Sequence, residues 1–275
     1  MTDKKKIISF SLWGNEPKYT VGALANAMYA EEVYPDWVCR FYISSEVDVE
    51  VIQRLEEMDR VEVIVLGKSQ KGDHKNSLLR FLPAEEDDIE VVIFRDCDSR
   101  LNYREQAAVN EWLQSDKKFH IMYDHPNYSS FFLAGCWGVK YPGLAGVSAL
   151  IRYYLMDVVN RPWEKIATLN DESQLCYRKG VDQNFLENVV YPIAQLSCMR
   201  HDDFSQNVLG YKIGRPFPTH KSIVQGYVGE SLNVDESPAE PEWRILAFEK
   251  PAVEVLMERK EFIKEIQEEI VKDFS

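Results

Sequence analysis

Hydrophobic and polar positions alternate along the first half of the chain in a repeating strand–helix order. Short apolar runs, which favour buried strands, recur at residues 7–12, 37–43, 61–66, 89–96 and 119–123. Between them, the pattern predicts helices from Pro17 onward and at 49–58, 78–82 and 103–113. The first of these would carry apolar side chains at Val21, Leu24, Ala25 and Met28. Such alternation predicts an α/β fold, with a mainly parallel central sheet flanked by helices.

The second half has a less regular pattern. We expect a strand at 131–140, interrupted at Ala134-Gly135, and a late strand at 195–200. Helices are expected at 144–158, 172–178 and 182–189. Proline and glutamate between 237 and 243 predict a connector, and apolar positions at helical spacing predict an amphipathic helix at 253–271. We therefore expect one domain over residues 1–235, with 236–275 forming a connector and a helix that packs on it or joins two copies as a homodimer.

Composition narrows the functional classes. The 275 residues, 45% of them hydrophobic, suffice for one large α/β domain. The net charge of −13 argues against a nucleic-acid partner, because no basic surplus is available to neutralise phosphates. No signal peptide and no membrane span is expected. Five scattered cysteines (39, 97, 136, 176 and 198) predict no disulfide framework. These features together predict a cytoplasmic protein.

Two aspartates, Asp96 and Asp98, follow the apolar run that begins at residue 89. Ligands of open α/β sheets bind at the carboxyl ends of strands. Side chains two apart in an extended strand share a face, so both carboxylates could hold one divalent metal. Arg95 and Arg100, with Arg80 upstream, are candidates for a diphosphate because guanidinium donates bidentate hydrogen bonds to phosphate oxygens. A solvated junction between strand and loop is the alternative.

The order of motifs resembles glycosyltransferases of the GT-A type, a Rossmann-like single-domain fold, and most of all family 8, which includes glycogenin and lipopolysaccharide galactosyltransferases. Four blocks carry the resemblance: Ser9-Phe-Ser-Leu-Trp-Gly14, Ser77-Leu-Leu-Arg80-Phe-Leu-Pro before Asp96-Cys-Asp98, Phe131-Phe-Leu-Ala-Gly135, and Asp182-Gln-Asn-Phe-Leu186. The chain is also similar to glycosyltransferase-like proteins of bacteria and large viruses. That likeness rests on Phe94–Arg104, His125-Pro126 with Gly135-Cys-Trp-Gly138, and His201-Asp202 with Pro216-Phe-Pro-Thr219.

The resemblance implies a metal-dependent hexosyl- or pentosyltransferase that uses a UDP- or GDP-sugar, with a glycan or other hydroxyl as acceptor and retention of configuration. It implies Mn²⁺ or Mg²⁺ at Asp96 and Asp98. The implied donor site comprises Trp13, Gly14, Tyr19, Arg80, Arg95, Asp96, Ala134 and Gly135. Asp182 and Gln183 would contact the sugar, and His125 would bind the acceptor or act on its proton. A helix-capping role for Asp182 and a structural hydrogen bond for His125 are the alternatives.

The sequence departs from family 8 at two points. Asn184 stands where the family usually has the second aspartate of its D-Q-D block. The family's C-terminal H-x-G-x-x-K-P-W block, which supplies a histidine ligand, is not found. His201 is therefore the expected third metal ligand and His220 the second choice, while both could instead be structural histidines in loops.

Two other functions fit part of the pattern. A phosphatase of the haloacid dehalogenase type also places D-x-D after an apolar strand, and Asp202-Asp203 could imitate its later acidic pair. Such phosphatases usually carry D-x-D on the first strand, whereas here about three strands precede it. A transferase that has lost activity and serves as a nucleotide-binding scaffold is the non-enzymatic alternative.

Overall fold

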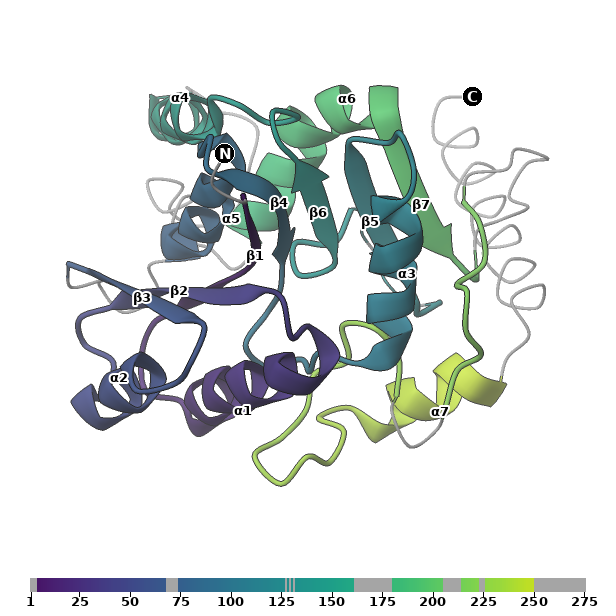
Figure 1. The fold of residues 1–275 in the computed structure, drawn as a ribbon, viewed down its shortest axis with the longest axis horizontal. Coiled ribbons are helices and arrows are strands. Elements are labelled where there is room, and N and C mark those ends of the chain that lie inside the picture. Colours follow the sequence, from purple (N-terminus) through teal and green to yellow (C-terminus); the bar gives the residue numbers. More distant parts are fainter. Residues whose placement is uncertain are drawn as a thin grey trace, which may run out of the picture.

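The computed structural model describes residues 4–67, 74–126, 128, 130, 132–160, 180–204, 214–222 and 226–249. Its centre is a seven-stranded sheet of order β3-β2-β1-β4-β6-β5-β7 (Figure 1). The strands are β1 Lys5–Leu12, β2 Val38–Ser44, β3 Val61–Leu66, β4 Ile89–Phe94, β5 Phe119–Tyr123, β6 Trp137–Lys140 and β7 Cys198–Asp202. Because β6 alone pairs antiparallel with its neighbours, the other six strands run in one direction. The expected α/β fold with a mainly parallel sheet is confirmed.

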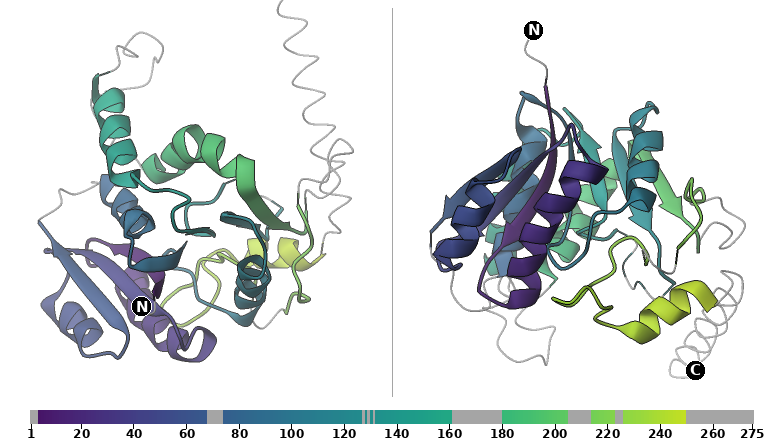
Figure 2. Two further views of the ribbon diagram at one scale, coloured as in Figure 1. Left: turned by 45° about the horizontal axis from the view of Figure 1, so that its top comes forward. Right: turned by 60° about the horizontal axis from the view of Figure 1, so that its bottom comes forward.

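Helices cover both faces of this sheet (Figure 2). On one face lie α1 Pro17–Val33, α2 Val49–Glu56 and α3 Tyr103–Leu113, whose buried side chains share a core with β1, β2 and β4. The other face is covered by the 3-10 helix η1 His74–Glu85, α4 Val147–Asn160, α5 Val181–Phe185, the π-helical turn η4 Leu186–Val190 and α6 Tyr191–Ala194. The short 3-10 helix η5 Gln195–Ser197 leads into β7, and α7 Pro241–Glu249 follows later.

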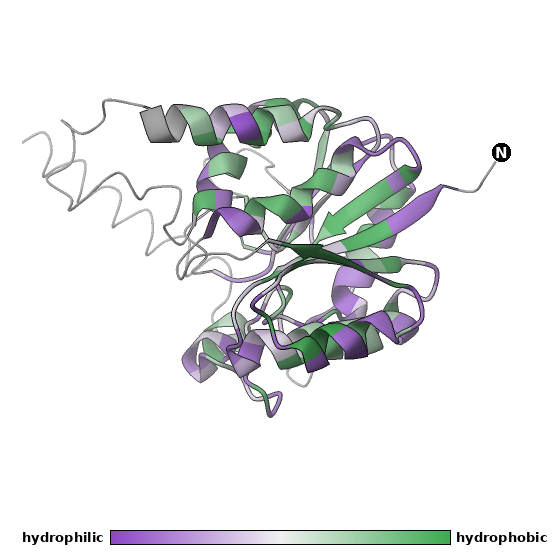
Figure 3. Cartoon of the chain, turned by 90° about the vertical axis from the view of Figure 1, so that its left-hand side faces the viewer, coloured by the Kyte–Doolittle hydropathy of each residue, from purple (hydrophilic) through white to green (hydrophobic). Residues whose placement is uncertain are grey.

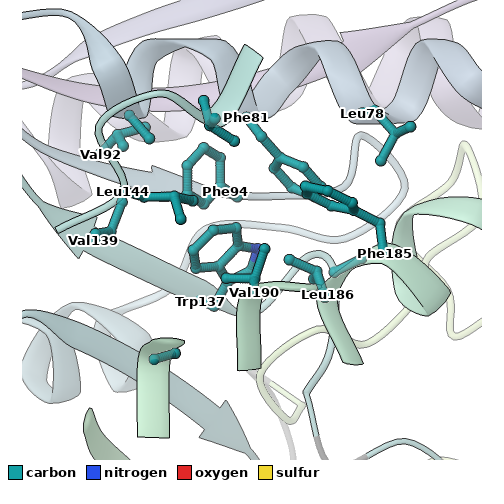
Figure 4. Packing of buried hydrophobic residues seen from close by; sticks show 14 of the residues in the cluster. Leu78, Phe81, Val92, Phe94, Trp137, Val139, Leu144, Phe185, Leu186 and Val190 are labelled. Atoms are coloured by element: carbon teal, nitrogen blue, oxygen red, sulfur yellow. The ribbon is translucent and has the colours of Figure 1, made fainter. Parts of the chain in front are cut away.

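Strand β4 shows how the sheet divides the two cores. Val92 and Phe94 point to the core under η1, whereas Val91 and Ile93 point to the core under α1. Phe94 lies 4.2 Å from the Trp137 ring and 5.1 Å from the Phe81 ring, centroid to centroid (Figure 4). The strands are mostly apolar, while the helices carry apolar and polar stripes (Figure 3). From Val91 to Phe94, β4 is therefore buried on both faces, as its apolar run predicts.

Several expected boundaries are corrected. β4 ends at Phe94, two residues before Asp96, and the expected strand at 131–140 is only the four residues of β6. The late strand begins at Cys198 because the residues before it complete a helical segment. In α1, Leu24 is buried as expected, whereas Met28 is 61% exposed, and the buried side of the helix also carries small residues such as Gly22 and Ala23. Small side chains permit a closer approach of this helix than the expected apolar set would.

The expected helices at 172–178 and 253–271 lie outside the described residues. Within the expected connector, residues from Pro241 onward form α7 instead of an irregular segment. The four cysteines of the described part, Cys39, Cys97, Cys136 and Cys198, are free thiols. Among the helices that the structure describes, none combines the length and apolarity needed to cross a membrane.

The strand order places a topological switch point between β1 and β4. From β1 the chain continues to β2 on one side, whereas from β4 it continues through α3 to β5 on the other side. In open α/β sheets, ligands bind at the carboxyl ends of the two strands that flank such a point. Gly14 follows β1 there and Asp96 follows β4, while antiparallel β6 starts at the same end of the sheet, two residues after Gly135.

Candidate functional site

Asp96 and Asp98 lie in the turn that follows β4, and their side chains have separate neighbours. Asp96 faces η1 and α5, where Arg80 binds it, whereas Asp98 faces α1 and the segment around Ser231. The extended backbone ends at Phe94, so the geometry of a strand does not place the two carboxylates on one face, and a metal held by both stays a prediction. Both remain at the switch point, with side-chain exposures of 47% for Asp96 and 18% for Asp98.

Arg80 connects Asp96 to Asp182. Its Nη1 donates to Asp96 Oδ1 and, at 3.0 Å, to the carbonyl oxygen of Arg95, and its Nη2 donates to Asp182 Oδ2 at 2.7 Å. Burial lowers the pKa of Arg80, but the two carboxylates outweigh it and leave that pKa raised. The side chain is only 4% exposed. Arg80 therefore holds two acids in place, and the expected direct contact with a diphosphate does not match its position.

Gly135 leaves the space that the Asp96 carboxylate occupies. A β-carbon on Gly135 would lie 2.1 Å from Asp96 Oδ2, far inside contact distance. The neighbouring Ala134 is fixed to α5, since its N–H donates to Gln183 Oε1 at 3.1 Å. Gln183 Nε2 in turn donates to Ser130 Oγ at 2.5 Å. The structure thus brings together five of the expected site residues, namely Arg80, Asp96, Gly135, Asp182 and Gln183, with Ala134 beside them.

Asp98 is held by residues that the sequence pattern does not reveal. Lys18 Nζ lies 3.1 Å from Asp98 Oδ2, and Ser231 Oγ donates to the same oxygen at 2.8 Å. The N–H of Leu232 donates to the Asp98 carbonyl at 2.8 Å. The contact with Ser231 alone spans 133 residues of sequence, so no local motif could have indicated it. Burial lowers the pKa of Lys18, but the attraction of Asp98 leaves that pKa raised.

Arg95 and Arg100 do not reach the site as expected. Arg95 is 2% exposed, and its Nε donates to Glu105 Oε1 at 3.1 Å on the side of the sheet covered by α1 and α3. Arg100 binds Glu236 through Nε and Nη2 and also donates from Nη1 to the carbonyls of Cys97 and Ser99. Both arginines shape the turn that carries the aspartates. Neither offers a guanidinium to a diphosphate in this arrangement.

The residues expected at the nucleotide lie at the end of β1 and the start of α1. Trp13 meets the His74 ring edge-on at 6.0 Å, and Gly14 has a φ of +71°, in the left-handed region that favours glycine. Tyr19 is half-buried on α1, and burial together with the negative charge of Asp98 raises its pKa. Trp13 and Gly14 therefore follow the carboxyl end of β1, and Tyr19 lies at the start of α1. That they bind a nucleotide stays a prediction.

His201 is not a ligand of a metal at Asp96. It lies on β7, three strand positions from β4, which is about 14 Å at ~4.8 Å per strand. Its Nδ1 is 2.7 Å from His120 Nε2, and its Nε2 is 3.1 Å from Glu111 Oε2. The prediction failed because β6 and β5 separate β7 from β4. His220, the second choice, is exposed in the segment that follows β7.

His125 lies at the expected edge of the sheet but is covered. Its ring stacks on Trp243 of α7 at 4.6 Å with an interplanar angle of 13°, and its Nε2 is 2.8 Å from the Trp243 carbonyl oxygen. The rings of Tyr128 and Tyr227 are also close, at 5.5 and 4.7 Å. With an exposure of 0%, His125 is a packing residue of this aromatic cluster, and the expected role toward an acceptor does not fit.

The side chains at the switch point carry a net negative charge that a divalent cation would offset. Asp96, Asp98 and Asp182 face two cations, Arg80 and Lys18, so one negative charge remains in this group. In the described part of the chain, no three or more His, Cys, Asp or Glu residues are arranged to hold a metal. Two carboxylates fit Mg²⁺-type binding, in which water and substrate phosphates complete the coordination. They do not fit a metal site built from protein ligands alone.

No protein-family model matches the sequence, and no curated protein matches it. Solved structures with a similar arrangement include a glycosyltransferase involved in the glycosylation of the major capsid of PBCV-1, at 15% identity over 79% of this chain and 94% of that chain, with a TM-score of 0.43. Another is an active-site mutant of LgtC, at 11% identity, 71% and 72% coverage and a TM-score of 0.41.

A third similar structure is 4-diphosphocytidyl-2C-methyl-D-erythritol synthase from Anaerococcus prevotii, at 14% identity, 63% and 81% coverage and a TM-score of 0.39. All three likenesses combine low identity with a TM-score below 0.5. What this chain acts on has to follow from its own site residues.

Proposed function

We propose that this protein is a metal-dependent glycosyltransferase of the GT-A type. It transfers a hexosyl or pentosyl group from a nucleoside-diphosphate sugar, with UDP or GDP as the nucleotide, to a hydroxyl of a glycan or similar acceptor. The motif resemblance supports this activity. Retention of the anomeric configuration is part of the proposal.

One observation carries the proposal. Asp96, Asp182 and Gly135 come from three distant segments of the chain and meet at the switch point of the sheet, where Arg80 binds both carboxylates. Nothing in the hydrophobic pattern requires these three residues to meet. Their positions match the motif order of the resemblance, in which D-x-D, a strand with Ala-Gly and a D-Q block surround the donor.

Each residue of the proposed site has its own role. Asp96 and Asp98 would hold Mn²⁺ or Mg²⁺, which, when bound, supplies positive charge to offset that of the leaving nucleotide. Trp13, Gly14 and Tyr19 bind the nucleoside at the end of β1. Asp182 and Gln183 contact the sugar and orient it toward the acceptor, while Arg80 fixes Asp96 and Asp182 in a constant geometry. Without a cation, the remaining negative charge of the group would repel a diphosphate.

The phosphatase alternative is disfavoured by the positions of its acidic residues. Asp202 lies on β7, three strands from Asp96, and Asp203 pairs with Arg104 rather than with any group at the switch point. The would-be nucleophile Asp96 is bound by Arg80 through a charge-assisted hydrogen bond, which stabilises the carboxylate and makes it a weaker nucleophile. The inactive nucleotide-binding scaffold is the remaining alternative, and experiment has to distinguish it from an active enzyme.

Thermal unfolding with UDP-, GDP-, CMP- and dTDP-sugars, each with and without Mn²⁺, tests donor binding. A donor present at about 100 times its Kd adds about 2.7 kcal/mol to the free energy of unfolding. We expect this stabilisation for a UDP- or GDP-sugar only when Mn²⁺ is present. Release of free sugar or transfer to a hydroxyl acceptor, followed by NMR of the product anomer, separates a retaining enzyme from a scaffold that only binds.

Asp98→Asn is the decisive variant for the metal assignment. It removes a carboxylate charge at the switch point without changing the size of the side chain, so it should leave the fold intact while abolishing both transfer and the Mn²⁺-dependent stabilisation. The control is Asp87→Asn, an exposed carboxylate just before β4, at the opposite edge of the sheet. Wild-type transfer by Asp98→Asn would overturn the metal site.

A further inference from the structure

Lys18 is a cation at the switch point that keeps partial access to solvent. Its side chain is 27% exposed, in the first turn of α1, with its Nζ 3.1 Å from Asp98 Oδ2 and 3.3 Å from Ser231 Oγ. By contrast, Arg80, Arg95 and Arg100 are each at most 8% exposed. Each of the three arginines is engaged by carboxylates and carbonyl oxygens of the chain itself. Lys18 therefore differs from them in being able to change partners.

Lys18 cannot stay beside Asp98 once a divalent cation binds to that carboxylate. The same oxygen, Asp98 Oδ2, accepts from Lys18 and from Ser231, and it belongs to a carboxylate proposed to hold the divalent metal. An ammonium group at that oxygen repels an incoming metal ion. A lysine can resolve the conflict because its charge sits at the end of a flexible four-carbon chain.

Asp98 itself is fixed, so any movement has to come from Lys18. The backbone carbonyl of Asp98 accepts from the N–H of Leu232 at 2.8 Å, and its side chain accepts from Ser231. The turn is also packed tightly against α1, since a β-carbon on Gly22 would lie 2.0 Å from the carbonyl oxygen of Cys97. The backbone of the turn is thus held at Asp98 by Leu232 and packed at Cys97 against α1.

We propose that Lys18 exchanges partners during donor binding. In the ligand-free protein it neutralises Asp98, and when a nucleoside diphosphate arrives with the divalent cation it releases Asp98 and binds a phosphate oxygen. This inference rests on the proposed function and adds a phosphate-binding residue that the sequence motifs do not contain. It also assigns the phosphate contact that the buried Arg80, Arg95 and Arg100 are not placed to make.

Partner exchange predicts two effects of opposite sign for Lys18→Met. Removing the ammonium frees Asp98, so the affinity for Mn²⁺ alone should rise, by about fivefold to tenfold. Removing a phosphate contact should lower the affinity for UDP or GDP at saturating Mn²⁺ by about tenfold. A purely structural lysine would lower both affinities together or change neither. Lys18→Arg keeps the positive charge and should restore most of the nucleotide affinity.

The experiment titrates the full-length protein with Mn²⁺ alone, by electron paramagnetic resonance, and then with UDP and GDP at saturating Mn²⁺, by calorimetry. Lys117→Met is the control, because Lys117 is an exposed lysine before β5 at the opposite edge of the sheet. Thermal unfolding confirms that each variant is folded. Opposite shifts for Lys18→Met, with no shift for Lys117→Met, support the inference.

Two results would overturn it in distinguishable ways. If the wild type binds nucleotide and Lys18→Met binds Mn²⁺ and nucleotide as the wild type does, or both affinities change in the same direction, partner exchange is wrong and the proposed function stands. If the wild-type protein binds neither UDP nor GDP in the presence of Mn²⁺, the proposed function fails and the inference fails with it.

Discussion

Arg80 and Asp182 form an ion pair of 2.7 Å between η1 and α5, although 102 residues separate them in the sequence. The same guanidinium binds Asp96, so one buried side chain links the turn after β4 to the helix that carries Asp182 and Gln183. A guanidinium suits this role because its donors point in fixed directions and serve two carboxylates at once. Arg80 is therefore a positioning residue for both acids.

Replacing Arg80 by methionine should lower both the free energy of unfolding and the affinity for nucleotide. Breaking a buried ion pair by removing one partner costs about 3–5 kcal/mol, and we expect the lower end because Asp96 is half exposed. Urea unfolding measures this loss, with Arg54→Met on the exposed end of α2 as the control. In the folded variant, Mn²⁺-dependent nucleotide binding should fall as well. A variant as stable as the wild type would contradict the proposed linking role.

Gly135→Ala tests the close contact between the segment before β6 and the Asp96 carboxylate. The added β-carbon would lie 2.1 Å from Asp96 Oδ2 and 2.6 Å from its Cγ, so the carboxylate has to move. We expect at least a tenfold loss of Mn²⁺-dependent nucleotide affinity, about 1.4 kcal/mol, measured by calorimetry. Gly67→Ala is the matched control, since no atom lies within 4 Å of its added β-carbon. Unchanged affinity in Gly135→Ala would show that Asp96 does not need its present position.

The buried histidine pair should make stability depend on pH. Burial lowers the pKa of His120 well below its usual 6.5, and burial also lowers that of His201, against the opposing effect of Glu111. The unfolded chain then binds more protons than the folded one below about pH 6.5. The free energy of unfolding should be constant above that pH and fall as pH decreases through it, by up to about 1.4 kcal/mol per pH unit for each histidine.

Urea unfolding of the wild type at pH 7.5, 6.5 and 5.5 measures this dependence. In His120→Gln the loss between pH 6.5 and 5.5 should shrink, because one of the two groups no longer takes up a proton on unfolding. A wild-type stability that rises on acidification would contradict the buried, neutral state of the pair. His201→Gln should leave Mn²⁺-dependent nucleotide binding intact, since His201 lies three strands away from Asp96.

The sequence predicts the fold and the core of the site because both have local signals. The apolar run before Asp96 identifies the central strand, and Pro17 at the start of α1 marks the helix after β1. Motif order then identifies Arg80, Gly135 and Asp182. Gly135 meets Asp96 because antiparallel β6 begins at the end of the sheet where β4 ends. Arg80 and Asp182 reach Asp96 from η1 and α5, which pack on the same face of the sheet.

The failed predictions depend on information that is not local. The sequence predicts His201 just after a strand, but the residue lies within β7, and the position of β7 in the sheet is set by how β5, β6 and β7 pair. His125 is at the correct edge, yet α7 covers it from the far end of the described chain. Ser231 contacts Asp98 across 133 residues. Hydrophobic periodicity reports which residues are buried, and it does not report which polar residues meet.

The variant Asp182→Asn tests whether Asp182 is only a structural partner of Arg80 or also contacts the sugar. Gly180 precedes α5, and Asp182 Oδ1 accepts from the Gln183 N–H at 2.9 Å, a bond that the oxygen of asparagine can also accept. The ion pair with Arg80 requires the charge, so Asp182→Asn should lower stability by about 1–2 kcal/mol. If Asp182 also contacts the sugar, kcat/KM for transfer should fall at least tenfold, about 1.4 kcal/mol of transition-state binding. UDP or GDP binding, which lacks the sugar, should remain within twofold of the wild type. Asn184→Asp, which rebuilds the family's D-Q-D block beside Asp182, is the companion variant. Equal kcat/KM for Asp182→Asn and the wild type would show that Asp182 is a structural residue.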